Sequence, residues 1–156
     1  MKSIHFLQKL QEREEQGLTR TVEVPQGIDF CSNDYLSFAA DAVLQKRIYE
    51  NLQNVPSGST SSRLIRGQHQ WLAELENQLA TWSSRESAIF FPSGYQANVA
   101  VMSTVLDENT VVFSDASNHA SLVDGIRLSK SEKVVFGHND LIDLGKKLAV
   151  APREKF

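Results

Sequence analysis

Apolar residues recur every three or four positions in several segments of the chain, which is the spacing of one helix face. The repeat of Leu44, Ile48 and Leu52 is a clear example. Polar and charged residues fill the positions between them, as in an amphipathic helix. The expected helices lie at residues 4–16, 44–54, 71–79, 97–105, from residue 119 onward, and from residue 141 to about residue 152.

Short apolar runs separate several of these helices and predict strands. They lie at residues 28–32, 87–91, 110–114 and 133–136. The run at 110–114 is nearly continuous, as expected of a parallel strand that is covered on both faces. From residue 87 onward strands and helices alternate, and that order favours an α/β fold with a parallel sheet.

The turn between the run at 87–91 and the next helix is the first candidate site. Pro92 stops the expected strand, Ser93 supplies a hydroxyl, and Gly94 permits a tight turn. A helix that begins here offers unpaired N–H groups and the positive end of its dipole, which suit a phosphate. Turns of this kind also carry Ser and Gly without any ligand. Neither the Walker pattern nor the dinucleotide fingerprint occurs.

His119 is the second candidate, because it follows the next strand of the same expected sheet. Ligands of such sheets bind beyond the carboxyl ends of the strands. An imidazole there can stack on a planar ring or exchange a proton near neutral pH, although a single histidine is more often a surface or core residue.

Three other polar features have two interpretations each. Arg20 is either a solvated loop residue or a ligand for a substrate carboxylate. The hydroxyl-rich loop at 56–63 is either a linker or an anion contact through Arg63. Glu74 and Glu76 are expected to be solvated on the helix that follows.

Composition narrows the class of protein. The chain has 156 residues, 41% hydrophobic and 22% charged, as in one ordinary globular domain. A net charge of −3 argues against nucleic acid, and no apolar run approaches membrane-spanning length. The single Cys31 excludes an intrachain disulfide, fits a cytoplasmic location and is expected to be buried. The four histidines are too scattered for a zinc site.

A set of short motifs in a characteristic order carries a family resemblance. The chain resembles the α-oxoamine synthases, which are pyridoxal-phosphate (PLP) enzymes of fold type I. The likeness runs from about residue 18 to residue 144. Its motifs are Ser32-Asn33-Asp34-Tyr35-Leu36, Gly58-Ser59-Thr60, Ser62-Arg63-Leu64, Leu75-Glu76, Ser93-Gly94-Tyr95, Ala97-Asn98, Asp115, Asn118-His119-Ala120-Ser121, Asp124-Gly125 and His138-Asn139-Asp140.

The resemblance implies a fold and a division of the chain. Residues 1–54 would form a helical N-terminal arm and a segment of the small domain. Residues 55–156 would form the first part of the PLP-binding large domain, a parallel-rich sheet flanked by helices. Because the family forms homodimers with sites at the interface, the loop at 58–63 would approach the partner's active site.

The resemblance also implies roles for individual residues. Ser93, Gly94 and Tyr95 would hold the PLP phosphate, largely through backbone N–H groups. His119 would be the catalytic residue that stacks on the pyridine ring and orients the substrate. Arg20 would lie near the carboxylate of the acyl substrate, and Asn33 would line the substrate pocket.

The implied reaction condenses an acyl-CoA or acyl-carrier-protein thioester with an amino acid and releases carbon dioxide. The motifs at 62–67 and 93–95 favour the branch that joins a pimeloyl thioester to L-alanine in biotin synthesis. The glycine–threonine branch, that of 2-amino-3-ketobutyrate, usually has Cys-Phe at positions 94 and 95. The aminolevulinate, autoinducer and sphingoid-base branches stay open.

Several positions depart from the family pattern. Ser37 and Ser61 stand where glycine is common, and each is strained only if its φ is positive. Leu72 stands where the family usually has histidine. The Schiff-base lysine of the family would lie downstream, and none of the lysines at 130, 133, 146, 147 and 155 matches its motif.

The chain is therefore expected to be inactive alone, oligomeric or poorly soluble, and to act as the front of such an enzyme, in a homodimer or with a C-terminal half. Two alternatives remain. One is a non-catalytic relative that binds PLP, phosphate or a partner chain. The other, less favoured, is a nucleotide-binding α/β domain.

Overall fold

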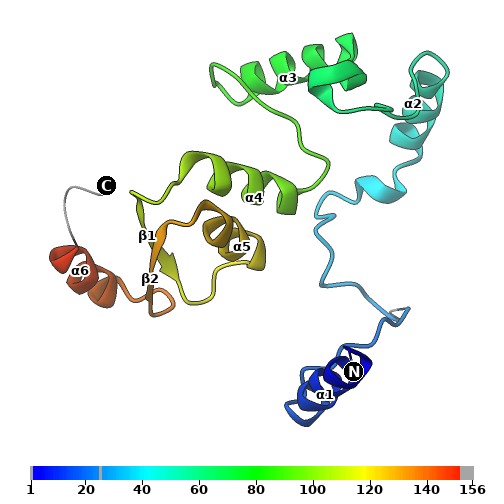
Figure 1. Cartoon of the computed structure of the whole chain (residues 1–156). Helices are drawn as coiled ribbons and strands as arrows, with labels where there is room; N and C mark the ends of the chain where they lie inside the picture. Colours follow the sequence, from blue (N-terminus) through cyan, green and yellow to red (C-terminus); the bar gives the residue numbers. More distant parts are fainter. Residues whose placement is uncertain (1, 25, 152–156) are drawn as a thin grey trace. The chain divides into compact units, whose positions relative to one another are not determined.

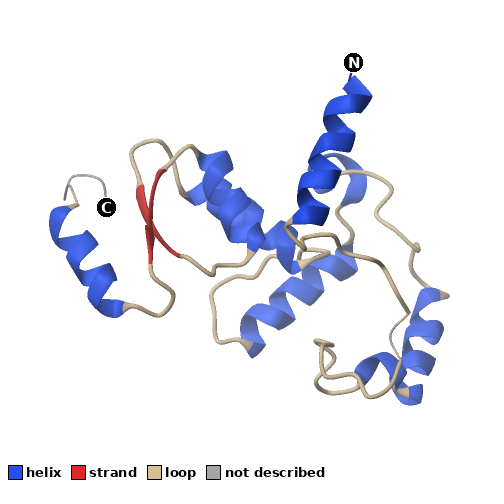
Figure 2. Ribbon diagram, turned by 90° about the horizontal axis from the view of Figure 1, so that it is seen from below, coloured by secondary structure: helices blue, strands red, loops and turns tan. Residues whose placement is uncertain are grey.

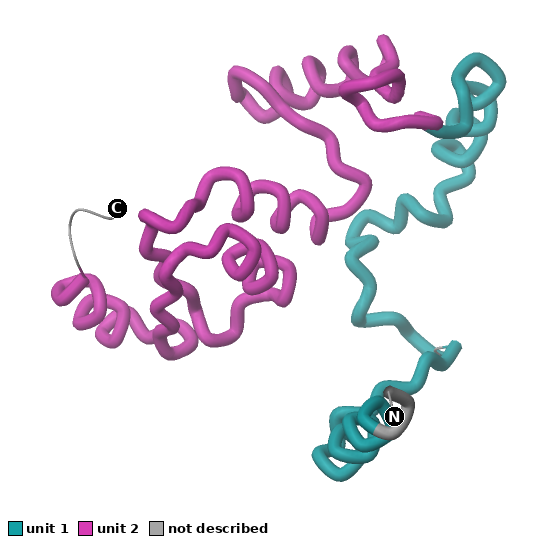
Figure 3. The backbone as a smooth tube through the Cα atoms, viewed as in Figure 1, with its two compact units in different colours: residues 1–58 teal, residues 59–156 magenta. Residues whose placement is uncertain are grey.

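The computed structural model describes residues 2–24 and 26–151, with side chains from residue 5 onward. The chain divides into two compact units, residues 1–58 and 59–156 (Figure 3). Each unit is described by itself. Lys155 and the expected end of the last helix at residue 152 lie outside the described residues.

The first unit consists of two helices and the turns between them (Figure 1). Helix α1 spans Lys2–Glu15 and α2 spans Ala42–Leu52, with a short 3-10 turn, η1, at Phe38–Ala40. Both helices confirm the predictions that the apolar spacing of the sequence made. None of the described side chains in this unit is buried, so its structure is held by local hydrogen bonds.

The strand expected at residues 28–32 is wrong. Asp29 Oδ1 accepts hydrogen bonds from the backbone N–H groups of Cys31 at 2.8 Å and Ser32 at 3.0 Å, so the segment turns instead of extending. A side-chain acceptor of this kind competes with a sheet ladder for the same donors. Cys31 is exposed, which also corrects the expectation that it is buried.

Carboxylates cap the next two elements of this unit. Asp34 accepts from Phe38 N at 2.8 Å and from Ala39 N at 3.0 Å, and Asp41 caps α2 by accepting from Leu44 N at 2.6 Å. Between them Ser37 has φ of 56° and ψ of 31°, the left-handed conformation. The serine at 37 is therefore strained, whereas Ser61 is not among the described residues with positive φ.

The second unit carries the α/β part of the chain (Figures 1 and 2). Strands β1 (Val111–Asp115) and β2 (Glu132–Phe136) pair in parallel, in register from Val111 with Glu132 to Asp115 with Phe136. This pair confirms the expected parallel sheet. The helices of the unit are α3 (Gln70–Trp82), α4 (Gly94–Val105), α5 (Ala120–Ser129) and α6 (Leu141–Val150), with a π-helical turn, η2, at Arg63–Gly67.

Residues 87–91 do not form the buried strand that the sequence predicts. Within the described residues the sheet contains only β1 and β2, so this segment has no ladder partner. Ile89 is 69% exposed and Phe90 is 46% exposed. An extended apolar run becomes a strand only where a neighbouring strand satisfies its backbone groups.

Helices α4 and α5 pack against each other and form the closest helix pair of this unit (Figure 1). Gly125 makes the close approach feasible, because a Cβ at that position would lie 2.6 Å from Met102 Cβ and 3.2 Å from Asn98 O. Ile126 of α5 and Val111 of β1 are buried and belong to the apolar core of this unit. The packing fixes the N-terminus of α4 relative to that of α5.

Glu76 is not solvated as the sequence suggested. Its carboxylate receives a two-pronged hydrogen bond from Arg63, at 2.8 and 2.7 Å, and also accepts from Phe90 N at 2.7 Å. The bond from Arg63, followed by that from Phe90, holds the pKa of Glu76 below its ordinary value. Arg63 is therefore occupied by an internal partner, which corrects its interpretation as an anion contact.

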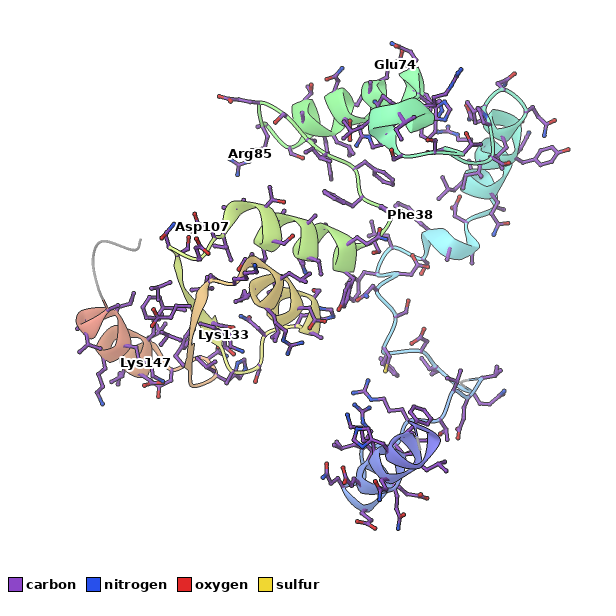
Figure 4. All side chains as sticks on the ribbon, in the orientation of Figure 1. Phe38, Glu74, Arg85, Asp107, Lys133 and Lys147 are labelled. Carbon is purple, nitrogen blue, oxygen red and sulfur yellow. The ribbon has the colours of Figure 1, made fainter. Side chains whose placement is uncertain are left out.

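One further contact closes the C-terminal end of the described chain. Lys147 of α6, labelled in Figure 4, donates to Val135 O at 2.7 Å and to Asp143 at 2.6 Å. Lys147 thus ties α6 to β2. No helix in the described part of the chain has the length and apolar character needed to cross a bilayer.

Candidate functional site

The N-terminus of α4 is built as a cap that leaves two donors free. Ser93 is the N-cap residue, and its hydroxyl accepts from Gln96 N at 3.2 Å while its carbonyl accepts from Ala97 N at 3.1 Å. The N–H groups of Gly94 and Tyr95 then have no partner among the described residues. Since the first turn contains no acidic residue, the positive end of the helix dipole is not neutralised there.

Gly94 contributes space and not an unusual backbone conformation. Its φ is not positive, so the backbone conformation at this position does not by itself demand glycine. A Cβ built on Gly94 meets nothing within 4 Å. The glycine therefore leaves an open approach to the free N–H groups of the first turn.

His119 occupies the equivalent position on the next helix, as the N-cap residue of α5. It follows β1 by four residues, at the carboxyl edge of the parallel pair. Its Nδ1 accepts from Ser121 N at 3.2 Å and lies 2.7 Å from Ser121 Oγ. The described residues offer no hydrogen-bond partner to its Nε2, so that edge of the ring is open.

Tyr95 joins the two helix termini. Its ring meets that of His119 edge-on, with centroids 6.3 Å apart and an interplanar angle of 73°. Its hydroxyl donates to Asp124 of α5, and this hydrogen bond raises the pKa of the phenol above its ordinary value. Asp124 in turn pairs with Arg127 at 3.0 Å. The phenol therefore stays protonated and spans α4 and α5.

A second link between the same helices lies deeper. Asn98 of α4 donates through Nδ2 to Ser121 Oγ at 3.0 Å. Ser121 is completely buried. Sequence reasoning assigned no role to Asn98, Ser121 or Asp124, because partners 23 and 29 positions apart show no local pattern.

Asp115 orders the loops at the carboxyl edge of the sheet. Its carboxylate accepts from Ser117 N at 2.7 Å, Asn139 N at 3.0 Å and His138 Nδ1 at 2.9 Å. The bond from Asn139, then those from Ser117 and His138, lower the pKa of Asp115 to about 2. The loop that leads to His119 is thereby fixed to the loop after β2.

The structure thus brings together four of the six predicted site residues, Ser93, Gly94, Tyr95 and His119. Arg20 and Asn33 are exposed and belong to the first unit, so their roles stay predictions. Among the described residues there is no group of three or more His, Cys, Asp or Glu side chains that could hold a metal ion. Chemically, the arrangement offers an anion site at the start of α4 and an imidazole ring beside it.

Comparison with known proteins gives the class to which this arrangement belongs. The family described as "Aminotransferase class I and II" matches residues 25–156. The 8-amino-7-oxononanoate synthase of Lysinibacillus sphaericus is 40% identical, over 92% of this chain and 40% of that protein. The chain therefore spans well under half the length of this curated relative.

Solved structures give the same result for the fold. Serine palmitoyltransferase from Sphingomonas wittichii is 34% identical with a TM-score of 0.72, over 76% of this chain and 30% of that one. Serine palmitoyltransferase from S. paucimobilis with a bound PLP–myriocin aldimine is 27% identical with a TM-score of 0.78, over 96% of this chain and 42% of that one.

The chain belongs to the aminotransferase class I and II family. Within it, the chain falls among the α-oxoamine synthases, the group that contains both the oxononanoate synthases and serine palmitoyltransferase. It corresponds to the N-terminal portion of those enzymes, with the α/β architecture of partial fold type I.

Proposed function

We propose that this chain supplies the part of a PLP-dependent acyltransferase that holds the cofactor phosphate and covers the cofactor ring. One observation carries the proposal: the open N-terminus of α4 and the ring of His119 are held together by Tyr95 and by helix packing. The first turn fits a phosphate, because it offers two free N–H donors and a glycine that leaves space for the anion.

Each residue at this site has a defined task in the proposal. The backbone N–H groups of Gly94 and Tyr95 bind the phosphate, and Ser93 holds the turn in shape through Gln96 N. His119 would face the pyridine ring of PLP and orient the amino-acid substrate. When bound, PLP supplies the electron sink for decarboxylation and carbon–carbon bond formation. Tyr95 and Asp124 keep the two helix termini at a fixed separation.

The substrate part of the proposal follows the relatives. We assign the chain to the 8-amino-7-oxononanoate synthase branch, with a pimeloyl thioester and L-alanine as substrates. Curated relatives of that name at about 40% identity support this choice. Arg20 would bind the distal carboxylate of the thioester and Asn33 would line its pocket, in a homodimer.

Cofactor binding is tested by titrating the isotopically labelled chain with PLP and, as a control, with pyridoxal, which lacks the phosphate. The amide signals of Gly94 and Tyr95 and the ring signals of His119 should move with PLP, and pyridoxal should bind more weakly. Equal binding of the two compounds, or shifts that avoid these residues, would refute the phosphate site. Borohydride treatment of the same sample reports whether any resident lysine is modified.

The substrate assignment needs an assay of the whole reaction. We would replace the matching segment of the Lysinibacillus sphaericus enzyme with residues 1–156 of this chain and measure carbon dioxide release. L-Alanine should be preferred over glycine and L-serine, and Arg20→Ala should raise KM for pimeloyl thioester while leaving that for L-alanine unchanged. Preference for serine or glycine would move the chain to another branch.

A further inference from the structure

Hydrogen-bond donors from Ser121 face the Nδ1 atom of His119 and require that atom to be unprotonated. The backbone N–H of Ser121 points at Nδ1 from 3.2 Å. A backbone N–H donates and never accepts, so Nδ1 must present a lone pair to it. In the neutral ring the proton then belongs on Nε2.

The side chain of Ser121 reinforces this choice. Asn98 Nδ2 donates to Ser121 Oγ at 3.0 Å, and Ser121 Oγ lies 2.7 Å from His119 Nδ1. An amide nitrogen is also a pure donor, so it occupies a lone pair of the hydroxyl and directs the hydroxyl proton toward Nδ1. Because Ser121 is completely buried, water does not compete for this bond.

We propose that Asn98 and Ser121 are positioning residues that hold His119 as the tautomer with its proton on Nε2. The relay runs from α4 through α5 to the ring, across two helices that pack against each other (Figure 1). For the proposed function, on which this consequence rests, the relay fixes the ring plane beside the cofactor and makes Nε2–H the donor available to a bound ligand.

The tautomer can be measured directly on the chain without any cofactor. Nitrogen-15 shifts of the two ring nitrogens distinguish a protonated from an unprotonated atom, and His119→Asn identifies the relevant signals among the four histidines. At pH 8, we expect Nδ1 to be unprotonated and Nε2 to be protonated. One ordinary hydrogen bond shifts an equilibrium by about fivefold, so two donors should favour this tautomer by more than about tenfold.

A change at Asn98 tests whether the relay is the cause. Asn98→Asp keeps the shape but replaces a donor by an acceptor, so the Ser121 hydroxyl should turn toward the carboxylate and leave Nδ1. The preference should fall at least about fivefold. Asn118→Asp is the matched control. Asn118 directly precedes His119 but lies outside the relay, and its Nδ2 donates to Ser114 Oγ at the same distance of 3.0 Å.

The outcomes separate cleanly. A wild-type ring with Nδ1 protonated, or equal effects of the two aspartates, would overturn the inference. Should Asn98→Asp fail to fold by circular dichroism, Ser121→Ala removes the same hydroxyl and should move the shifts in the same direction; unchanged shifts would then refute the relay. Adding PLP to the same sample tests the proposed function separately, because a fixed tautomer with no response to PLP would sink the function and leave the relay standing.

Discussion

Gly94→Asp separates the stability of α4 from its function as an anion site. The residue is the first of the helix, is exposed, and has no atom within 4 Å of a built Cβ, so the Cβ of an aspartate is accommodated there. A carboxylate at a helix N-terminus is stabilising by about 0.3–1 kcal/mol through the helix dipole. Replacing glycine in a helix adds a few tenths of a kcal/mol. The variant should therefore unfold at higher temperature than the wild type.

The same carboxylate should weaken binding of a phosphate. A phosphate group carries a charge near −2 at neutral pH. With charges about 5 Å apart and the dielectric constant of water, because the site is exposed, the repulsion is roughly 1.7 kcal/mol. The Kd for PLP should rise about tenfold to thirtyfold, and added salt should reduce the effect.

Two further variants make the measurement specific. Gly94→Ala occupies the open space without charge and reports the steric part alone. Gly145→Asp places the same carboxylate on α6, where a built Cβ also meets nothing within 4 Å. Fluorescence titration with PLP and thermal unfolding would be measured on all three. If Gly94→Asp changes the Kd by less than twofold, or no more than Gly145→Asp does, the start of α4 is not the phosphate site.

The structure supports three more predictions. Gly125→Ala drives a Cβ to 2.6 Å from its neighbour on α4 and should lower the free energy of unfolding by about 1–3 kcal/mol, whereas Gly145→Ala, in open space, should raise it by up to about 1 kcal/mol; urea unfolding compares them. The pKa of Asp115 is depressed to about 2, so its contribution is present above the unfolded value of about 3.9 and is lost as the pH falls toward 2; Asp115→Asn should flatten the acid limb of a pH–stability curve. Ser37 has a φ of 56°, so Ser37→Gly should relieve strain and slow amide hydrogen exchange across its turn. Ser61 is not among the described residues with positive φ, so Ser61→Gly should speed amide exchange around residue 61. The reverse order of the two effects would refute the strain at Ser37.

The sequence predicted the helices and the parallel pair because these depend on periodicity. The apolar spacing of α2, α4 and α6 is visible in the chain itself, and so is the apolar run of β1. The two strand predictions that were wrong, at residues 28–32 and 87–91, depend on hydrogen-bond partners that the apolar periodicity does not reveal. Residues 28–32 meet a side-chain acceptor, Asp29, and residues 87–91 have no ladder partner among the described strands.

The residues of the candidate site likewise divide into those that a local sequence signal predicts and those that it does not. Ser93 and His119 were predicted because each follows an apolar run and begins a helix, a local signal. The contacts that hold them were not predictable, since Tyr95 with Asp124 and Asn98 with Ser121 join residues far apart in the sequence. Glu76 was misread for the same reason, because its partners lie 13 and 14 positions away.

The site is formed although the predicted strand at residues 87–91 is absent, and this shows which contacts order the site. Residues 87–91 lead directly into the Ser93 turn, yet the turn is formed although that segment has no strand partner and exposes most of Ile89. What orders the turn is the cap of α4 itself, the close packing that Gly125 allows, and the bonds from Tyr95 to α5. All of these lie within residues 93–127. The geometry of the candidate site therefore rests on the pair of helices α4 and α5. The sheet contributes Asp115, which holds the loop that precedes His119 in the chain.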